Sequence, residues 1–202
     1  MMVVTKKVYP VNMVASIICK GFVADIFKSY FDLKGSFWDQ QKKCTSEARL
    51  LAYAFLISFV LFLERVPNKV TDRDIFSSAG LLLDYIGIDL FASIFFGPIF
   101  LYSLSALTHL ISVPFKGKAS FFEARLAFFW AMIVAAPLLL LVAVVQGLVP
   151  GGLFSQVFQC TAMVTYAWIF STIFCSAERF SSNKPLFFLL SFGYLYLSYV
   201  VT

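Results

Sequence analysis

The sequence predicts an all-α integral membrane protein: a bundle of five transmembrane helices with an N-terminal interfacial amphipathic helix. Hydrophobic residues make up 60% of the 202 residues and charged residues only 13%. Nearly every charge lies between five long apolar stretches. A soluble domain of this size has no interior that could bury five such segments, so lipid is their natural solvent. The expected spans are about 48–65, 88–113, 121–149, 153–177 and 185–201.

Residues 1–47 are expected to form a cytoplasmic N-terminal segment, and residues 48–202 the transmembrane domain. Within the first part, residues 22–34 have an amphipathic pattern, and Gly35 is expected to end this helix. The helix is too short and too charged to cross a bilayer, so it is expected in the interface, with its apolar arc against acyl chains or the bundle. The apolar arc is Phe22, Val23, Ile26, Phe27, Tyr30 and Leu33, and the polar arc is Asp25, Lys28, Ser29 and Asp32.

The first two spans need an adjustment to fit the bilayer. The first is short, and it crosses if Arg49 and Arg65 snorkel from opposite ends; the alternative is a buried or re-entrant helix. A single helix from Thr71 to Val113 would be about 60 Å long, twice the hydrocarbon thickness. We therefore expect a short surface helix that begins at Thr71, a break near residues 84–87, and then the second span.

Local signals mark the ends of the later spans. Ser120 and Glu123 fit a capping box at the start of the third helix. The turn at residues 149–152 should join the third and fourth spans as a hairpin. Pro185 fits the first position of the fifth helix.

The distribution of lysine and arginine predicts the orientation of the chain. Thirteen of these residues lie on the side of the N-terminus and three on the opposite side, so the N-terminus is expected in the cytoplasm and the C-terminus outside. The net charge of +5 then indicates contact with anionic lipid and not with nucleic acid. The expected location is a bacterial inner membrane.

Few polar residues fall where they could carry chemistry. His109, the only histidine, could bind a haem or a chlorophyll-type pigment, but a hydrogen-bonded packing histidine is favoured because no carboxylate lies at helical spacing from it. Asp89 could couple an ion, although an interfacial position accounts for it as well. An ion pair is expected between Glu123 or Arg125 and the groups that end the fourth helix, Glu178 and Arg179. No catalytic set or metal-ligand cluster stands out.

The stretch from His109 to Trp130 resembles the Yip-one family, the Ypt-interacting membrane proteins, and most of all its bacterial branch. The similarity lies in a histidine near the end of the second span, a basic glycine loop, and a Ser-Phe start to the third span. The segment Ala135-Ala136-Pro137-Leu138, followed by Gly147, is also similar. The resemblance implies five spans and a cytoplasmic amphipathic N-terminal region, and it implies no enzyme activity. The small-GTPase binding of eukaryotic members is not implied, because their Asp-Leu-Tyr-Gly-Pro-type segment is absent.

The expected function is therefore a non-enzymatic membrane scaffold or accessory subunit that acts by helix packing and by contact with lipid and other integral membrane subunits. One alternative is a cofactor- or pigment-contacting subunit of a photosynthetic or respiratory complex, with His109 as ligand. Another is a small transporter or channel that uses Asp89.

Overall fold

The structure is a computed structural model that describes residues 21–43, 46–71, 79–149 and 152–201. All regular elements in these ranges are helices. Residues 21–29 are helical and are followed by α2 (Leu33–Lys43), α3 (Glu47–Thr71), α5 (Ala79–Ser112), the 3-10 helix η1 (Val113–Phe115), α6 (Phe121–Leu148), α7 (Leu153–Ala177) and α8 (Lys184–Val201). The all-α prediction is thus confirmed for the described part.

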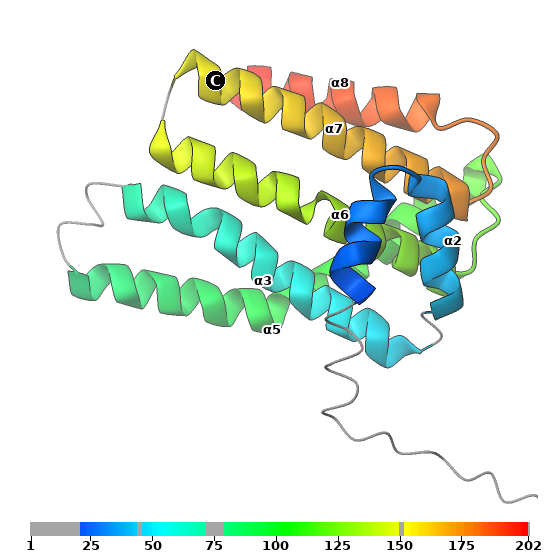
Figure 1. Ribbon diagram of the computed structural model, residues 1–202, viewed down its shortest axis with the longest axis horizontal. Coiled ribbons are helices and arrows are strands. Elements are labelled where there is room, and N and C mark those ends of the chain that lie inside the picture. Colours follow the sequence, from blue (N-terminus) through cyan, green and yellow to red (C-terminus); the bar gives the residue numbers. More distant parts are fainter. Residues whose placement is uncertain (1–20, 44–45, 72–78, 150–151, 202) are drawn as a thin grey trace, which may run out of the picture.

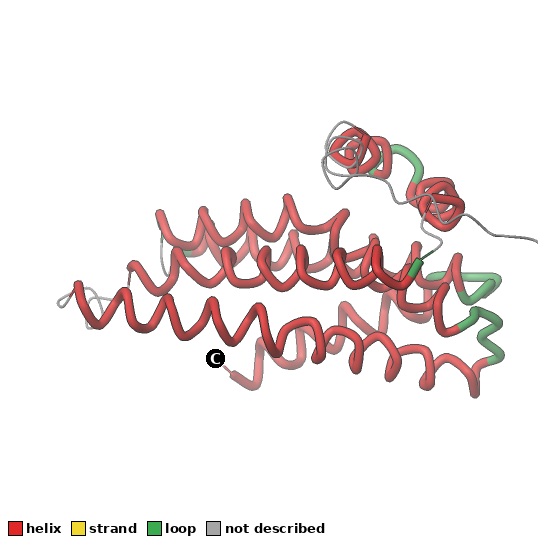
Figure 2. The backbone as a smooth tube through the Cα atoms, turned by 90° about the horizontal axis from the view of Figure 1, so that it is seen from below, coloured by secondary structure: helices red, strands yellow, loops and turns green. Residues whose placement is uncertain are grey.

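The long helices run side by side, and α6 occupies the middle of the bundle (Figure 1). It packs against α2, α3, α5 and α7, and a continuous run of its residues, from Leu126 to Ala131, is buried. Residues 21–43 form a helical hairpin, called here the N-terminal hairpin. Its two helices lie across the bundle on one side, where Figure 2 shows them nearly end-on.

Four helices of the described part are long and apolar enough to cross a membrane, over Glu47–Pro67, Leu83–Phe115, Phe121–Leu148 and Leu153–Ala177. Length and composition thus support four of the five predicted spans, and a fifth is not shown. The fifth apolar stretch does form a helix, α8, of 18 residues. At 1.5 Å per residue it is about 27 Å long, slightly less than the hydrocarbon thickness.

The amphipathic helix expected over residues 22–34 is not confirmed. The chain leaves the first helix after residue 29 and starts α2 at Leu33. Asp32 Oδ1 accepts a hydrogen bond from Gly35 N at 2.9 Å, which caps the start of α2, so Gly35 lies in the first turn of a new helix and ends none. The predicted arcs also fail, because Ser29 is fully buried while Phe27 is 63% exposed.

The break expected near residues 84–87 is also wrong. Helix α5 runs without interruption for 34 residues, about 51 Å. Gly87 costs only about 1 kcal/mol in a helix interior, too little to end a strongly apolar helix. A helix of this length fits a bilayer by tilting or by extending beyond it. The surface helix expected to begin at Thr71 lies mostly outside the described residues, and Thr71 itself is the last residue of α3.

The local predictions for α6 and α7 agree with the structure. Ser120 Oγ accepts from Glu123 N at 3.2 Å, and Glu123 Oε2 accepts from Ser120 N at 2.8 Å, which completes the capping box. Helix α7 begins at Leu153 and ends at Ala177, and it packs along α6 as expected for a hairpin. Two residues of the predicted turn, 150 and 151, lie outside the described residues.

Candidate functional site

His109 lies in the last turn of α5 and is buried against the end of α7. Its Nδ1 is 2.7 Å from Oε1 of Glu178, the residue that caps the C-terminus of α7. The His109 side chain is almost fully buried and the Glu178 side chain completely so. The sequence pattern did not reveal this pair, because the carboxylate comes from a different helix, 69 residues away along the chain.

Glu178 also closes the loop between η1 and α6. Its Oε2 accepts a hydrogen bond from Ala119 N at 3.1 Å, and its backbone oxygen accepts one from Lys118 N at 3.1 Å. The loop passes so close that a Cβ added at Gly117 would lie 2.4 Å from Glu178 Oε2. Glycine is therefore required at this position for steric reasons. The buried carboxylate of Glu178 therefore joins the end of α7 to α5 and to the loop between η1 and α6.

A carboxylate at Nδ1 holds the imidazole in one orientation, and metal-bound histidines are oriented in the same way. The rings of Phe121 and His109 pack edge to face, with 4.6 Å between the ring centroids. In the described part of the chain, no three histidine, cysteine, aspartate or glutamate side chains gather as a metal site. The role of His109 as a cofactor ligand therefore stays a prediction, while its hydrogen-bonded packing is observed.

Charged side chains link the starts and ends of the helices at this end of the bundle. Arg179 Nη2 lies 3.7 Å from Glu123 Oε1, so the ion pair expected between the third and fourth helices is confirmed for these two residues. Glu123 Oε1 also accepts from Gln41 Nε2 at 2.6 Å, which attaches α2 to α6. Arg125 instead pairs with Glu47 at the start of α3, at 2.6 Å.

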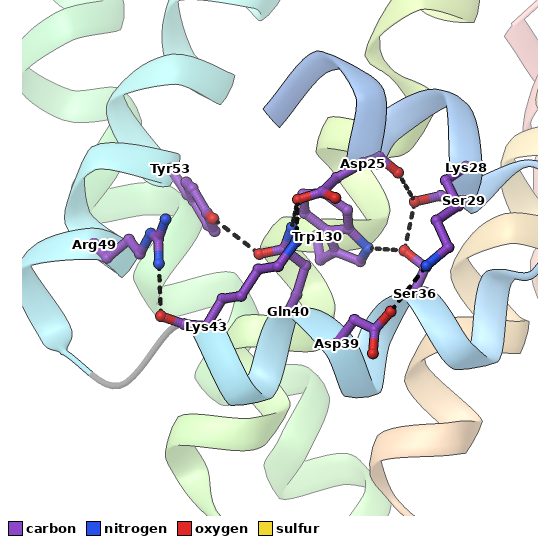
Figure 3. A network of polar contacts seen from close by, with 10 residues as sticks. All are labelled: Asp25, Lys28, Ser29, Ser36, Asp39, Gln40, Lys43, Arg49, Tyr53 and Trp130. Atoms are coloured by element: carbon purple, nitrogen blue, oxygen red, sulfur yellow. Dashed lines mark hydrogen bonds and ion pairs between the residues drawn. The ribbon is translucent and has the colours of Figure 1, made fainter. Parts of the chain in front are cut away.

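A chain of hydrogen bonds fastens the N-terminal hairpin to α6 (Figure 3). Trp130 Nε1 donates to Ser36 Oγ at 2.8 Å, and Ser29 Oγ donates to the Asp25 carbonyl oxygen at 2.6 Å. The two serine hydroxyls are hydrogen-bonded to each other. Since each hydroxyl has one proton, Ser36 must be the donor to Ser29, and the chain runs in one direction from the indole to the carbonyl.

The side chains of Asp25 and Gln40 continue this network towards α3 (Figure 3). Asp25 Oδ2 accepts from Lys43 Nζ at 2.6 Å and from Gln40 Nε2 at 3.1 Å, and Gln40 Oε1 accepts from Tyr53 at 3.2 Å. Tyr30 separately donates to the Val134 carbonyl oxygen at 2.6 Å, and burial raises the pKa of its phenol. The hairpin is thus bound to both α3 and α6 by polar contacts.

Asp89 lies towards the other end of α5, beside Arg65 of α3. The Arg65 Nη1 to Asp89 Oδ1 distance is 3.0 Å, and Arg65 Nη2 donates to Ser93 Oγ at 3.0 Å. Arg65 was expected to snorkel from its end of the first span, and in the structure it links α3 to α5. The ion pair balances the charge of Asp89, which accounts for the carboxylate without an ion-coupling role.

No protein-family model matches the chain, and neither a curated protein nor a solved structure matches it.

Proposed function

We propose that this chain is a non-enzymatic integral membrane scaffold or accessory subunit of the Yip-one type, which acts by helix packing and by contact with lipid and other membrane subunits. The observation that supports this best is that buried polar side chains and exposed apolar side chains make different contacts. The buried polar groups described above connect one helix or loop to another, as His109 and Glu178 do. Large apolar side chains, in contrast, cover the outside of the candidate spans.

The outer face of α5 is the strongest candidate for a contact with another membrane helix. Five neighbouring bulky residues in its middle part are all more than half exposed, and two of the rings, Phe91 and Phe95, stack at 4.4 Å. Aromatic side chains are enriched in protein interfaces and give large contact areas at low entropic cost. These residues, called here the α5 ridge, are Phe91, Phe95, Phe96, Ile99 and Phe100.

The proposed topology has five spans, with α8 as the last one, the N-terminus in the cytoplasm and the C-terminus outside a bacterial inner membrane. Thirteen lysine and arginine residues against three support this orientation. The cytoplasmic end then carries the N-terminal hairpin, the capping box and the His109–Glu178 pair. The resemblance of residues 109–130 to the Yip-one family agrees with this topology.

Site-specific photo-crosslinking in native membranes tests the scaffold proposal. A photoreactive amino acid at Phe96 of the α5 ridge is expected to capture a membrane protein. The matched control is the same probe at Leu141 on α6, which is also about half exposed and apolar. Adducts with lipid alone at both positions, together with a monomer after mild detergent extraction, would count against the proposal.

A second candidate function is a subunit that contacts a haem or a chlorophyll-type pigment through His109. The carboxylate at Nδ1 favours it, because this contact directs the other ring nitrogen, Nε2, as a ligand. The absorption spectrum of the purified protein tests it. A visible band that is lost in His109→Ala would support the ligand role, and a spectrum that this substitution leaves unchanged would exclude it.

A further inference from the structure

A polar pocket lies where α2 meets the end of α7. Its volume is about 300 Å³, within the range of small-ligand pockets. Two cations line it, Lys34 from α2 and Arg179 from the loop after α7, together with the indole of Trp38 and the polar Ser181 and Asn183. These groups come from two elements that the chain brings together only in the folded bundle.

Arg179 holds an uncommon backbone conformation at this pocket. Its φ of 58° lies in the left-handed region. The residue that adopts this conformation at the end of a helix is usually a glycine. Phe180 N donates to the Cys175 carbonyl oxygen at 3.0 Å, which completes the helix-ending motif around Arg179. A non-glycine residue in this conformation costs roughly 1–2 kcal/mol of backbone strain, and such strained residues cluster at functional sites. Arg179 therefore carries strain that a glycine would not, and its side chain lines the pocket.

Neighbouring contacts fix the walls of the pocket. Asn183 Nδ2 donates to Thr172 Oγ1 at 3.0 Å, which ties the loop to α7. Glu123 faces Arg179 from α6 at 3.7 Å and leaves the arginine side chain about half exposed. Lys34 on α2 is exposed. Arginine binds phosphate with a rigid fork of donors, and lysine adds a mobile positive charge, so this pair suits a phosphate group.

The position of the pocket indicates the source of the phosphate. Helix α7 is a candidate span that ends at Ala177, two residues before Arg179. Under the proposed topology this is the cytoplasmic boundary of the membrane, at the depth where lipid headgroups lie. Trp38 at the rim is a residue type enriched at this depth. We propose that the pocket binds the phosphate group of an anionic phospholipid headgroup from the cytoplasmic leaflet.

This inference deepens the lipid contact of the proposed function, and a substitution pair tests it. Arg179→Gly removes the charge and also relieves the backbone strain, so the protein is expected to stay at least as stable while it binds lipid more weakly. Lys116→Gly is the matched control, because Lys116 has the same left-handed conformation, with φ of 67°, and does not line the pocket. Lys34→Gln is a second variant of the pocket that leaves the loop intact.

The assay is a native mass spectrometry titration of the full-length protein in neutral detergent. The ligand is short-chain phosphatidylglycerol, and the comparison is phosphatidylcholine, a zwitterion whose phosphate is balanced by its own ammonium group. Arg179→Gly and Lys34→Gln should each weaken phosphatidylglycerol binding by about tenfold, the effect of losing one charge-assisted contact. Lys116→Gly should leave it unchanged. Equal weakening by Lys116→Gly, or none by the two pocket variants, would overturn the site.

A competition with inorganic phosphate distinguishes the two sources of the ligand. We expect inorganic phosphate to displace phosphatidylglycerol poorly at equal concentration. Displacement as effective as that by the lipid itself would assign the pocket to free phosphate and overturn the headgroup assignment. Neither result bears on the α5 ridge, so a failure here is distinct from a failure of the scaffold proposal.

Discussion

Replacing Glu178 by alanine should strongly destabilise the bundle. The change removes the acceptor of the buried His109 ring at 2.7 Å and of the partly buried Ala119 N at 3.1 Å. The buried imidazole left without a partner costs about 1–3 kcal/mol and the lost hydrogen bond of the partly buried amide about 0.5–1.5 kcal/mol, so the sum is about 1.5–4.5 kcal/mol, with a centre near 3. For a chain of this length 1 kcal/mol shifts Tm by roughly 2–4 °C, which predicts a fall of about 6–12 °C.

The assay is the loss of monodisperse protein on heating in detergent, followed by size-exclusion chromatography. Glu178→Gln should lose less than half as much stability, because the amide can still accept from Ala119 N and donate to the imidazole. Glu47→Ala is a control that removes a largely exposed carboxylate from its ion pair with Arg125. This loss is expected to cost no more than about 1 kcal/mol.

A double-mutant cycle separates the His109–Glu178 contact from the other effects of each substitution. His109→Ala and Glu178→Ala remove the same hydrogen bond, so the combined loss of stability should be smaller than the sum of the single losses. Additive losses would refute the reasoning, as would a Glu178→Ala shift no larger than that of Glu47→Ala.

Three further predictions concern helix packing, the N-terminal hairpin and topology. Gly97→Ala should lower Tm, because the added Cβ would lie 2.5 Å from Ser58 Oγ. Gly87→Ala on the same helix meets open space and should raise stability by about 1 kcal/mol. Thermal unfolding of both variants checks this pair of predictions. Trp130→Phe removes the indole donor to Ser36 and should speed cleavage of the hairpin in limited proteolysis, and an unchanged rate would show that the hydrogen bond does not hold it. Periplasmic and cytoplasmic reporters fused at the N-terminus and in the loop between α7 and α8 should place both sites in the cytoplasm. A periplasmic signal at either site would contradict the proposed orientation.

The features that the sequence predicts well are those set by neighbouring residues. The capping box at Ser120 needs only a serine and a glutamate three positions apart, and the structure contains both of its hydrogen bonds. The apolar stretch between two turn signals predicted a fourth span at about 153–177, and α7 has the same first and last residues. The break expected near Gly87 is wrong, because one glycine costs too little to end an apolar helix, and a long helix can tilt and also extend beyond the bilayer.

The partners of the buried polar groups could not be predicted, because they depend on which helices become neighbours. His109 was expected to be hydrogen-bonded, but its partner Glu178 approaches from α7, and nothing in the spacing of the two residues indicates it. The ion pair between Glu123 and Arg179 was predictable as a class, since both were expected at the same membrane face. Which two of the four candidate residues form the pair still depended on the register between α6 and α7.

The N-terminal hairpin explains why a helical wheel can assign faces wrongly. Trp130 is fully buried in α6, and a buried indole N–H needs an acceptor in an otherwise apolar surface. Ser36 supplies it, and Ser29 in turn satisfies the Ser36 hydroxyl, so both serines face the protein. The outward side of the first hairpin helix, which carries Ser29, is then left to residues such as Phe27. A wheel that sorts residues by polarity assumes that water is the partner of every hydroxyl, and here the partner is another helix.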